Sequence, residues 1–200
     1  MRLGISNGSL LKREMEMLQK AGITFNGAGR GGVIKICGYD LVTEIVLARP
    51  QMMPWLIKEG CVDFGICGWD CVVEAGLDNQ LEKMAEFSFG KNLSRPVRVV
   101  LYGEEEKFID EARSLVITEY PNITKKFVRF ARTLFSFGTT EACVKAVSGR
   151  PVFGVGIVET GRSLRENNLL EIETFLVSPV VLVSKTRNPV ARELADRLSR

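Results

Sequence analysis

Short apolar segments alternate along this chain with segments of helical periodicity, and no other feature limits its possible folds as strongly. Apolar runs bounded by glycine, proline or polar residues are typical of buried strands. The segment 9–20 instead has helical spacing, with Leu10, Leu11, Met15 and Leu18 on one face. Strands that alternate with helices in this way predict an α/β fold with largely parallel or mixed sheets flanked by helices.

The elements predicted from this alternation extend over most of the chain. The predicted strands are residues 2–6, 33–37, 40–48, 62–67, 95–103, 114–120, 151–158 and 177–185. The predicted helices are about 9–20, 54–60, 69–76, 122–133, 140–147, 163–168 and 189–198.

Two segments, 58–74 and 148–166, share one pattern. Each reads as a helix end, a glycine, an apolar strand that contains Phe-Gly, a small turn and a further helix. Phe64-Gly65 and Phe153-Gly154 take the same place in the two copies. We interpret this repeat as two similar lobes, each of which ends a strand at a loop facing a shared cleft.

Charge and hydropathy exclude several functional classes. A formal net charge of +3 with scattered basic residues argues against a nucleic-acid partner. The N-terminal segment lacks the apolar core of a signal peptide, and no run approaches 18 apolar residues, which argues against a membrane protein. We therefore expect a cytoplasmic protein whose five cysteines are reduced.

The chain contains no histidine. Its absence removes histidine-based triads, Cys-His dyads, histidine-ligated metals and the usual general base at neutral pH. No CxxC pair is present either, so no protein metal site is predicted. Chemistry on this chain must depend on carboxylates, basic residues, hydroxyls and positioning, which favours a substrate that already carries a good leaving group.

The best candidate binding site is "VGIVETGRSLRENNL", residues 155–169, where a strand runs into hydroxyls, a glycine and a helix start. Hydroxyl groups, a close backbone approach at a glycine and free amides of a first helical turn together suit a phosphate group. An ordinary capped helix after a strand explains the same residues. The candidate residues are Glu159, Thr160, Gly161, Arg162, Ser163 and Leu164.

Further candidates lie in the first half of the chain. "SNGSL", residues 6–10, is a small polar loop between a strand and a helix, which suits either a ligand or a helix cap. Arg30 stands in a glycine-rich stretch, and Arg49 precedes Pro50 and is therefore extended. Both arginines suit an anionic or purine ligand, although solvated surface arginines are an alternative. Asp70 either caps the helix that follows it or contacts a ligand.

Taken in order, these segments resemble the ATP phosphoribosyltransferase family in its short form. The resemblance rests on the first loop, on the glycine-flanked Arg30, and on Glu74 and Glu141 at the family's glutamate positions. It also rests on the motifs "RPQMMP", "DFGICGWD", "ITEYPNITKKF", "TTEACVKAV" and "IVETGRSLRENNL", the last being the most specific.

The resemblance implies an α/β fold of two lobes, like type II periplasmic binding proteins, in which the last strand and helix return to the first lobe. Lobe I would be residues 1–95 plus about 180–200, and lobe II about 96–179. It implies Mg²⁺-dependent attack of N1 of ATP on C1′ of phosphoribosyl pyrophosphate (PRPP), with release of pyrophosphate, as the first step of histidine biosynthesis.

The resemblance also implies substrates and partners. Residues 159–163 would hold the 5′-phosphate end of PRPP, and Arg30, Arg49 and Asp70 would face ATP or pyrophosphate. We assign no catalytic base, because N1 of ATP needs none to attack. Because the chain ends at Arg200, no C-terminal regulatory domain is expected. A homodimer or larger oligomer is expected, with a separate regulatory subunit resembling histidyl-tRNA synthetase.

Several charged positions of the family carry other residues here, namely Asn7, Ser9, Met52, Val152 and Gly156. A nucleotide- or phosphate-binding paralogue of the same fold, catalytically degraded or re-purposed, is therefore the rival interpretation.

Overall fold

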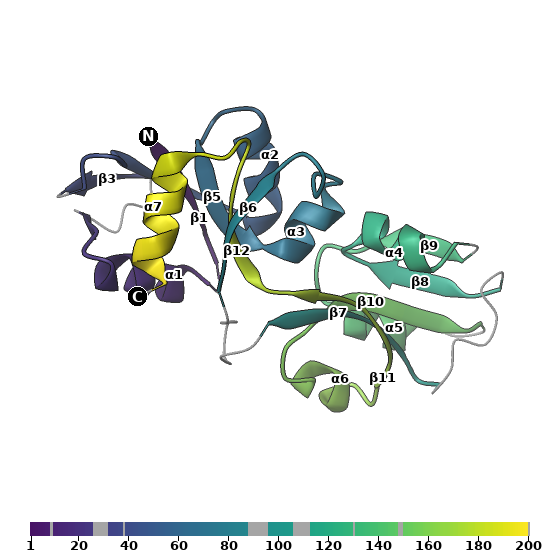
Figure 1. Cartoon of the computed structure of the whole chain (residues 1–200). Helices are drawn as coiled ribbons and strands as arrows, with labels where there is room; N and C mark the ends of the chain where they lie inside the picture. The colour runs from purple at the N-terminus through teal and green to yellow at the C-terminus, as the bar shows by residue number, and fades with distance from the viewer. Residues whose placement is uncertain are drawn as a thin grey trace. The chain divides into compact units, whose positions relative to one another are not determined.

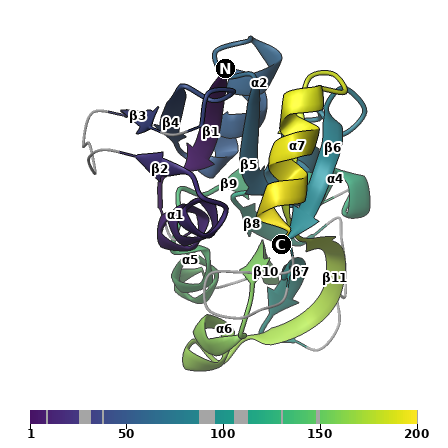
Figure 2. The ribbon, with the colours of Figure 1, turned by 60° about the vertical axis from the view of Figure 1, so that its left-hand side comes forward.

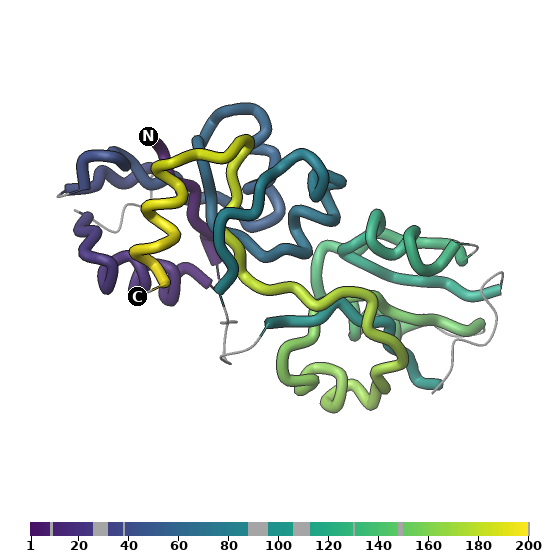
Figure 3. The backbone as a smooth tube through the Cα atoms, in the orientation of Figure 1, coloured from purple at the N-terminus to yellow at the C-terminus, as the bar shows by residue number. Residues whose placement is uncertain are grey.

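The computed structural model describes residues 1–8, 10–25, 32–37, 39–87, 96–105, 113–129, 131–147 and 150–199. The chain divides into two compact units. Unit 1 comprises Met1–Arg95 and Pro179–Arg200, and unit 2 comprises Pro96–Ser178. The chain therefore leaves unit 1 once, forms the whole of unit 2, and returns to unit 1 for its last strand and helix (Figure 3).

Unit 1 is built on a seven-stranded mixed sheet with the order β2-β3-β4-β1-β5-β12-β6. The central strands β4, β1 and β5 are parallel, whereas β3 and β12 run antiparallel to their neighbours. The strands are β1 Arg2–Ser6, β2 Thr24–Phe25, β3 Val33–Cys37, β4 Glu44–Ala48, β5 Phe64–Gly68, β6 Glu82–Phe87 and β12 Val180–Ser184. The helical segments are α1 Leu11–Lys20, the 3-10 turn η1 Pro50–Met52, α2 Met53–Lys58, α3 Trp69–Glu74 and α7 Pro189–Leu198.

Helices cover both faces of this sheet, with α1 and α7 on one face and α2 and α3 on the other (Figures 1 and 2). Because side chains alternate across a strand, β5 and β12 each supply both hydrophobic cores. Ile66 and Leu182 belong to the core under α1 and α7, while their neighbours Cys67 and Val183 belong to the core under α2 and α3. The nearly continuous apolar sequence of these strands follows from this burial on two sides.

Unit 2 is built on a five-stranded mixed sheet with the order β11-β7-β10-β8-β9. Its central strand β10 is antiparallel to β7 and parallel to β8. The strands are β7 Val97–Gly103, β8 Leu115–Thr118, β9 Arg132–Phe135, β10 Val152–Val158 and β11 Leu170–Ser178. The helices are α4 Pro121–Phe127, α5 Thr140–Ala146 and α6 Arg162–Glu166.

Three sequence predictions of elements need correction. The helix predicted over about 122–133 ends at Phe127, and strand β9 follows it, because that segment pairs in parallel with β8. The strand predicted over 177–185 is two strands separated at Pro179, which lacks the N–H that a continuous ladder would need. The strand predicted over 40–48 begins only at Glu44. Strands β2 and β6, and residues 170–176 of β11, have no counterpart in the prediction.

Within the described residues, no helix is long and apolar enough to cross a membrane.

Candidate functional site

The loop that follows β10 in unit 2 is the centre of the candidate site. β10 lies in the middle of its sheet, and its carboxyl end pairs with β7 as far as Val158, whereas β8 pairs with residues 152–155. The chain turns at Gly161, which has a φ of 68° and forms the N-cap of α6. A Cβ at Gly161 would lie 3.2 Å from Arg165 Nη1 and 3.4 Å from Glu171 Oε1. Glycine therefore suits this position because it adopts a positive φ readily and has no Cβ to approach these two side chains.

The hydrogen bonds within this loop fix its conformation but do not use all of its hydrogen-bond donors. The Arg162 N–H donates to Thr160 Oγ1 at 3.3 Å, and Arg165 Nη1 donates to the Thr160 carbonyl at 3.1 Å. The first-turn amides of Ser163 and Leu164 have no acceptor four residues back within the helix, which is the normal state of a helix start. The loop thus presents amides, hydroxyls and two arginines near one another.

The other side chains of α6 have distinct roles. Leu164 is 2% exposed and belongs to the hydrophobic core of unit 2, so its side chain anchors the helix and only its amide is available for a ligand. Arg162 is exposed and pairs with Glu166 at 2.7 Å. The hydrogen bond to Glu166, followed by that group's charge, raises the pKa of Arg162. Ser163 Oγ donates to Glu141 Oε1 at 2.9 Å.

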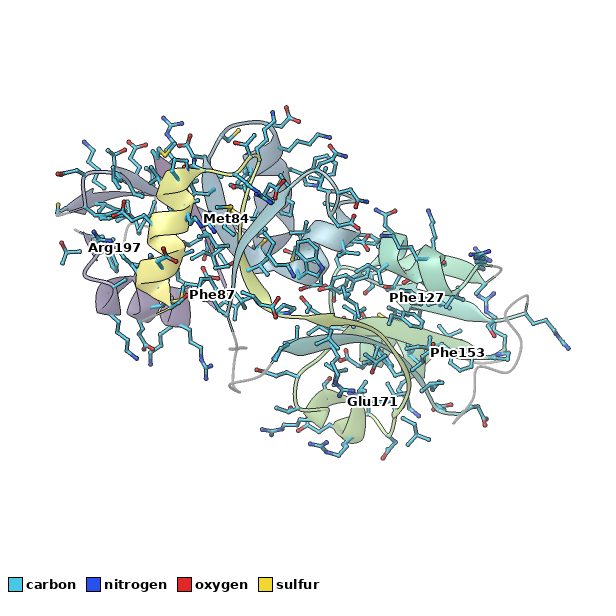
Figure 4. The ribbon with its side chains drawn as sticks, in the orientation of Figure 1. Met84, Phe87, Phe127, Phe153, Glu171 and Arg197 are labelled. Carbon is cyan, nitrogen blue, oxygen red and sulfur yellow. The ribbon has the colours of Figure 1, made fainter. Side chains whose placement is uncertain are left out.

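Beside the loop, strand β11 contributes an ion pair that the sequence analysis missed. Arg98 on β7 makes two hydrogen bonds to Glu171, of 2.6 and 3.0 Å (Figure 4 labels Glu171). Two-pronged pairing of this kind fixes the arginine in one orientation. The pair lies next to Gly161 and stiffens the strands that carry the loop. No local pattern marks it, since its partners come from different strands.

In unit 1 the parallel strands β4, β1 and β5 bring their carboxyl ends to one edge of the sheet. Ser6 and Ala48 are in register, so Asn7 and Arg49 leave the sheet side by side. The amide of Asn7 donates to the Ala48 carbonyl at 2.6 Å, which fixes this arrangement. Such an edge is where open α/β sheets bind ligands.

The predicted site residues of unit 1 occupy this edge in different ways. Arg49 is exposed and has an extended backbone (φ −60°, ψ 140°) just before η1. Asp70 lies in the first turn of α3, at the carboxyl end of β5, and is 2% exposed. Its Oδ2 accepts a weak hydrogen bond of 3.5 Å from Cys71 Sγ. Arg30 lies outside the described residues.

A buried carboxyl group behind this edge was also missed by the sequence analysis. Glu14 on α1 is fully buried, and its Oε2 accepts a 2.6 Å hydrogen bond from the Ser6 amide. Its other oxygen has no hydrogen-bond partner among the described residues. Burial raises the pKa of Glu14 to about 8, against the lowering effect of the hydrogen bonds with Ser6. An acidic residue in a helix is ordinarily expected on the solvated face, so the sequence pattern did not predict that Glu14 is buried.

Unit 2 also holds a cluster of polar side chains near the loop, formed by Tyr102, Glu119, Thr140 and Glu141. Thr140 Oγ1 lies 3.5 Å from Glu119 Oε1. Burial, followed by the charge of Glu141, raises the pKa of Glu119. In the part of the chain that the structure describes, no three acidic or cysteine side chains come together as metal ligands.

Two α/β units, with the second inserted before the last strand of the first, define a protein of the periplasmic-binding-protein type. A histidine kinase sensor domain with similarity to periplasmic binding proteins matches all of this chain and 88% of its own, with a TM-score of 0.56 at 10% identity, which shows the fold alone. The predicted fold class, α/β with mixed sheets, is confirmed.

Closer comparisons identify the family. A family model described as HisG, ATP phosphoribosyltransferase, matches residues 49–200. The ATP phosphoribosyltransferase of Chlorobaculum parvum is 32% identical over 210 aligned residues, covering 100% of this chain and 69% of the relative. A solved ATP phosphoribosyl transferase (HisG:HisZ) complex from Thermotoga maritima contains a chain that matches with a TM-score of 0.80 at 25% identity, covering 100% of this chain and 96% of that one. This chain belongs to the ATP phosphoribosyltransferase family, as the order of its motifs predicted.

Proposed function

We propose that this chain is the catalytic subunit of a cytoplasmic, short-form ATP phosphoribosyltransferase. It would transfer the phosphoribosyl group of PRPP to N1 of ATP, with release of pyrophosphate, as the first step of histidine biosynthesis. Family membership over the whole chain supports the reaction. The observation that carries the proposal within the molecule is the loop after β10, whose hydroxyls, amides and arginines suit a phosphate group.

The phosphate end of PRPP is assigned to this loop. Thr160 and Ser163 would donate through their hydroxyls, and the amides of Ser163 and Leu164 would donate from the helix start. Arg162 would add positive charge at the mouth of the loop, and Gly161 would allow the backbone to approach closely. Glu159, which directly follows β10, would lie beside the ligand.

The ATP or pyrophosphate end is assigned to the sheet edge of unit 1. Arg49 is exposed there and would attract a phosphate group. Asp70 is nearly fully buried, so its proposed part is to hold the turn between β5 and α3. Arg30 stays in this proposal on its motif alone.

The chemistry needs positioning more than acid–base catalysis. The N1 lone pair of ATP forms a bond to C1′ while the bond from C1′ to pyrophosphate breaks, and pyrophosphate leaves with the electron pair. Holding both substrates in line supplies much of the rate enhancement in reactions of this kind. When bound with the substrate phosphates, Mg²⁺ would offset their charge, and such an ion commonly needs only one or two protein carboxylates.

A regulatory partner belongs to the same proposal. The relative from Thermotoga maritima was solved as a HisG:HisZ complex, and its HisG-like chain is covered to 96% by this chain. We propose that this chain, too, binds a separate regulatory subunit, one resembling histidyl-tRNA synthetase, and that it forms a homodimer or larger assembly.

An absorbance assay for phosphoribosyl-ATP, with and without the regulatory subunit, tests the proposal. We expect product from ATP and PRPP, and a double variant Thr160→Val with Ser163→Ala should bind PRPP at least about 100-fold more weakly, because it removes two hydrogen bonds to a charged group, each of which contributes about 1.5–3 kcal/mol. Ser199→Ala, at the C-cap of α7 in unit 1, is the matched control and should bind normally. Saturable PRPP binding without product under either condition would favour the non-catalytic paralogue.

A further inference from the structure

Glu14 on α1 is a fully buried carboxyl group that lies behind the sheet edge assigned to ATP in unit 1. Its Oε2 accepts a 2.6 Å hydrogen bond from the amide of Ser6, the last residue of β1. The next residue, Asn7, leaves the sheet at that edge, and its amide donates to the Ala48 carbonyl at 2.6 Å. The carboxyl group of Glu14 is therefore bonded to the backbone one residue before the edge.

Glu14 is also the acidic residue in the first turn of α1, and Leu10 at the N-cap makes no side-chain cap hydrogen bond. A carboxylate at a helix start cancels part of the positive potential that the helix dipole places there. A protonated carboxyl group leaves that potential available to an external anion. The loop before the helix carries Asn7 and Ser9, so it has no basic side chain that could offset the charge of a buried carboxylate.

The surroundings of Glu14 favour its protonated form. Burial raises the pKa of Glu14 to about 8, and hydrogen bonds with the Ser6 amide and the Ser6 side chain oppose this effect. On β5 the Cys67 thiol responds to the same charge, because burial and then the charges of Asp70 and Glu14 raise the pKa of that thiol. Helix α7 packs against α1 and contributes apolar residues such as Ala191 to the core there. Among the described residues, no basic side chain is a cause of the shift at Glu14.

The hydroxyl group of Ser6 gives this proton a structural effect as well. Ser6 Oγ donates its single proton to the Ile66 carbonyl of β5 at 3.2 Å. A protonated Glu14 can donate to Ser6 Oγ and leave that bond in place. An ionised Glu14 only accepts, so it attracts the Ser6 proton away from Ile66. Ionisation of Glu14 therefore adds negative charge behind the edge and also weakens the connection between the ends of β1 and β5.

We propose that Glu14 couples a proton to nucleotide binding in unit 1, so that the sheet edge binds the phosphate groups of ATP while Glu14 is protonated and releases them when Glu14 ionises. This role rests on the proposed binding of ATP at that edge. Phosphate groups and a buried carboxylate behind them repel each other, and a buried charge is screened little by water and salt. ATP should therefore draw a proton onto Glu14. Because Glu14 is fully buried, it acts through Ser6 and through its charge, as a positioning residue.

Calorimetric titration of the full chain with ATP, between about pH 7 and about pH 9, tests this coupling. The last ionisation of a phosphate ester has a pKa of about 6, so ATP itself is fully ionised over this range. With Glu14 titrating at about pH 8, the apparent dissociation constant should rise by up to about 10-fold across the range. At about pH 8, titrations in buffers of different ionisation enthalpy should show uptake of up to about half a proton per ATP.

Glu14→Gln keeps the site uncharged at every pH. Its amide retains an acceptor for the Ser6 amide and offers an N–H to the Ser6 hydroxyl, as the protonated acid does. This variant should bind ATP at about pH 7 as tightly as the natural chain, keep that affinity at about pH 9, and take up less of a proton. Glu16→Gln, on the exposed side of α1, is the matched control and should keep the pH dependence of the natural chain. Ser6→Ala removes a hydrogen bond that lowers the pKa of Glu14, so its loss of affinity should begin at a higher pH.

The possible outcomes separate the proton coupling from the ATP site itself. Equal pH dependence and proton uptake in the natural chain and Glu14→Gln would overturn the coupling and leave ATP assigned to unit 1. Weaker ATP binding by Glu14→Gln at every pH would overturn it too, since the carboxylate would then favour binding. Absence of ATP binding to all of these proteins would contradict both the coupling and the proposed function. Circular dichroism of each sample measures the folded fraction, by which the dissociation constants are corrected.

Discussion

At the scale of single residues, two glycines of β10 differ sharply in their surroundings. A Cβ added at either Gly154 or Gly156 would lie near Tyr102, but only Gly154 lies directly under the Tyr102 ring. We expect Gly154→Ala to lower the free energy of unfolding by about 1–3 kcal/mol, because the added methyl group forces the buried ring to move. Gly156→Ala, with an ordinary contact of 3.4 Å, should change it by less than about 1 kcal/mol. Urea denaturation of both variants checks this, and equal losses would contradict it.

Glu14 gives a second prediction at this scale. Its pKa is about 8 in the fold against an ordinary value of 4.5, so the native state holds this proton more tightly than the unfolded chain. The stability that this proton contributes is complete below about pH 4.5 and is lost as the pH rises to about 8. Glu14→Gln removes the titration. As the pH rises through that window, the free energy of unfolding of the natural protein should therefore fall relative to that of Glu14→Gln, by up to about 1.4 kcal/mol per pH unit.

Urea denaturation at several pH values between 5 and 8 measures this difference. Glu16→Gln, on the exposed side of the same helix, is the control and should follow the natural protein closely. Parallel profiles for the natural protein and Glu14→Gln would mean that the buried carboxyl does not titrate in this range.

At the scale of elements, helix α7 is attached to unit 1 through a local cap and an apolar face. Asn188 Oδ1 accepts hydrogen bonds from the amides of Val190 and Ala191, at 2.9 and 3.4 Å. Asn188→Ala should lower the unfolding free energy by about 1 kcal/mol, since it leaves these helix-start amides without an acceptor. Asn188→Asp should keep most of that stability. Thermal unfolding of the two variants is the measurement, and an unchanged midpoint in Asn188→Ala would show that the cap contributes little.

Elements with strong local signals were predicted well, and weakly marked ones were not. β10 and α6 were expected at 151–158 and 163–168 and lie at 152–158 and 162–166, because a glycine-containing apolar run and a capped helix start mark them locally. The first two residues of β9, Arg132 and Thr133, are predicted from the sequence as the end of a helix. Its four residues form a strand because they pair with β8, and Leu134 and Phe135 on it are half exposed. Periodicity in so short a segment does not distinguish the two states.

At the scale of the whole molecule, the two units are expected to bind different parts of the substrates. We expect PRPP to slow amide hydrogen exchange in residues 159–166 of unit 2, where the loop and α6 bind its phosphate. ATP should slow exchange in residues 47–52 of unit 1, at the carboxyl end of β4. Mass spectrometry of peptides measures both, with a peptide from α7 as the internal control. Protection of the two segments in the reverse order would contradict the assignment of substrates to units.

The sequence by itself determined the α/β class, the family, and the loop after β10 with its glycine, hydroxyls and arginines. These features depend on patterns within short segments, because the local backbone conformation and the alternation of side chains follow directly from such patterns. Only the tertiary structure decided that Arg98 pairs with Glu171, that Glu14 is buried and accepts from the Ser6 amide, and that Leu164 belongs to the core. Each of these depends on which strands pair and which helix covers which face, and burial is the largest cause of the raised pKa of Glu14.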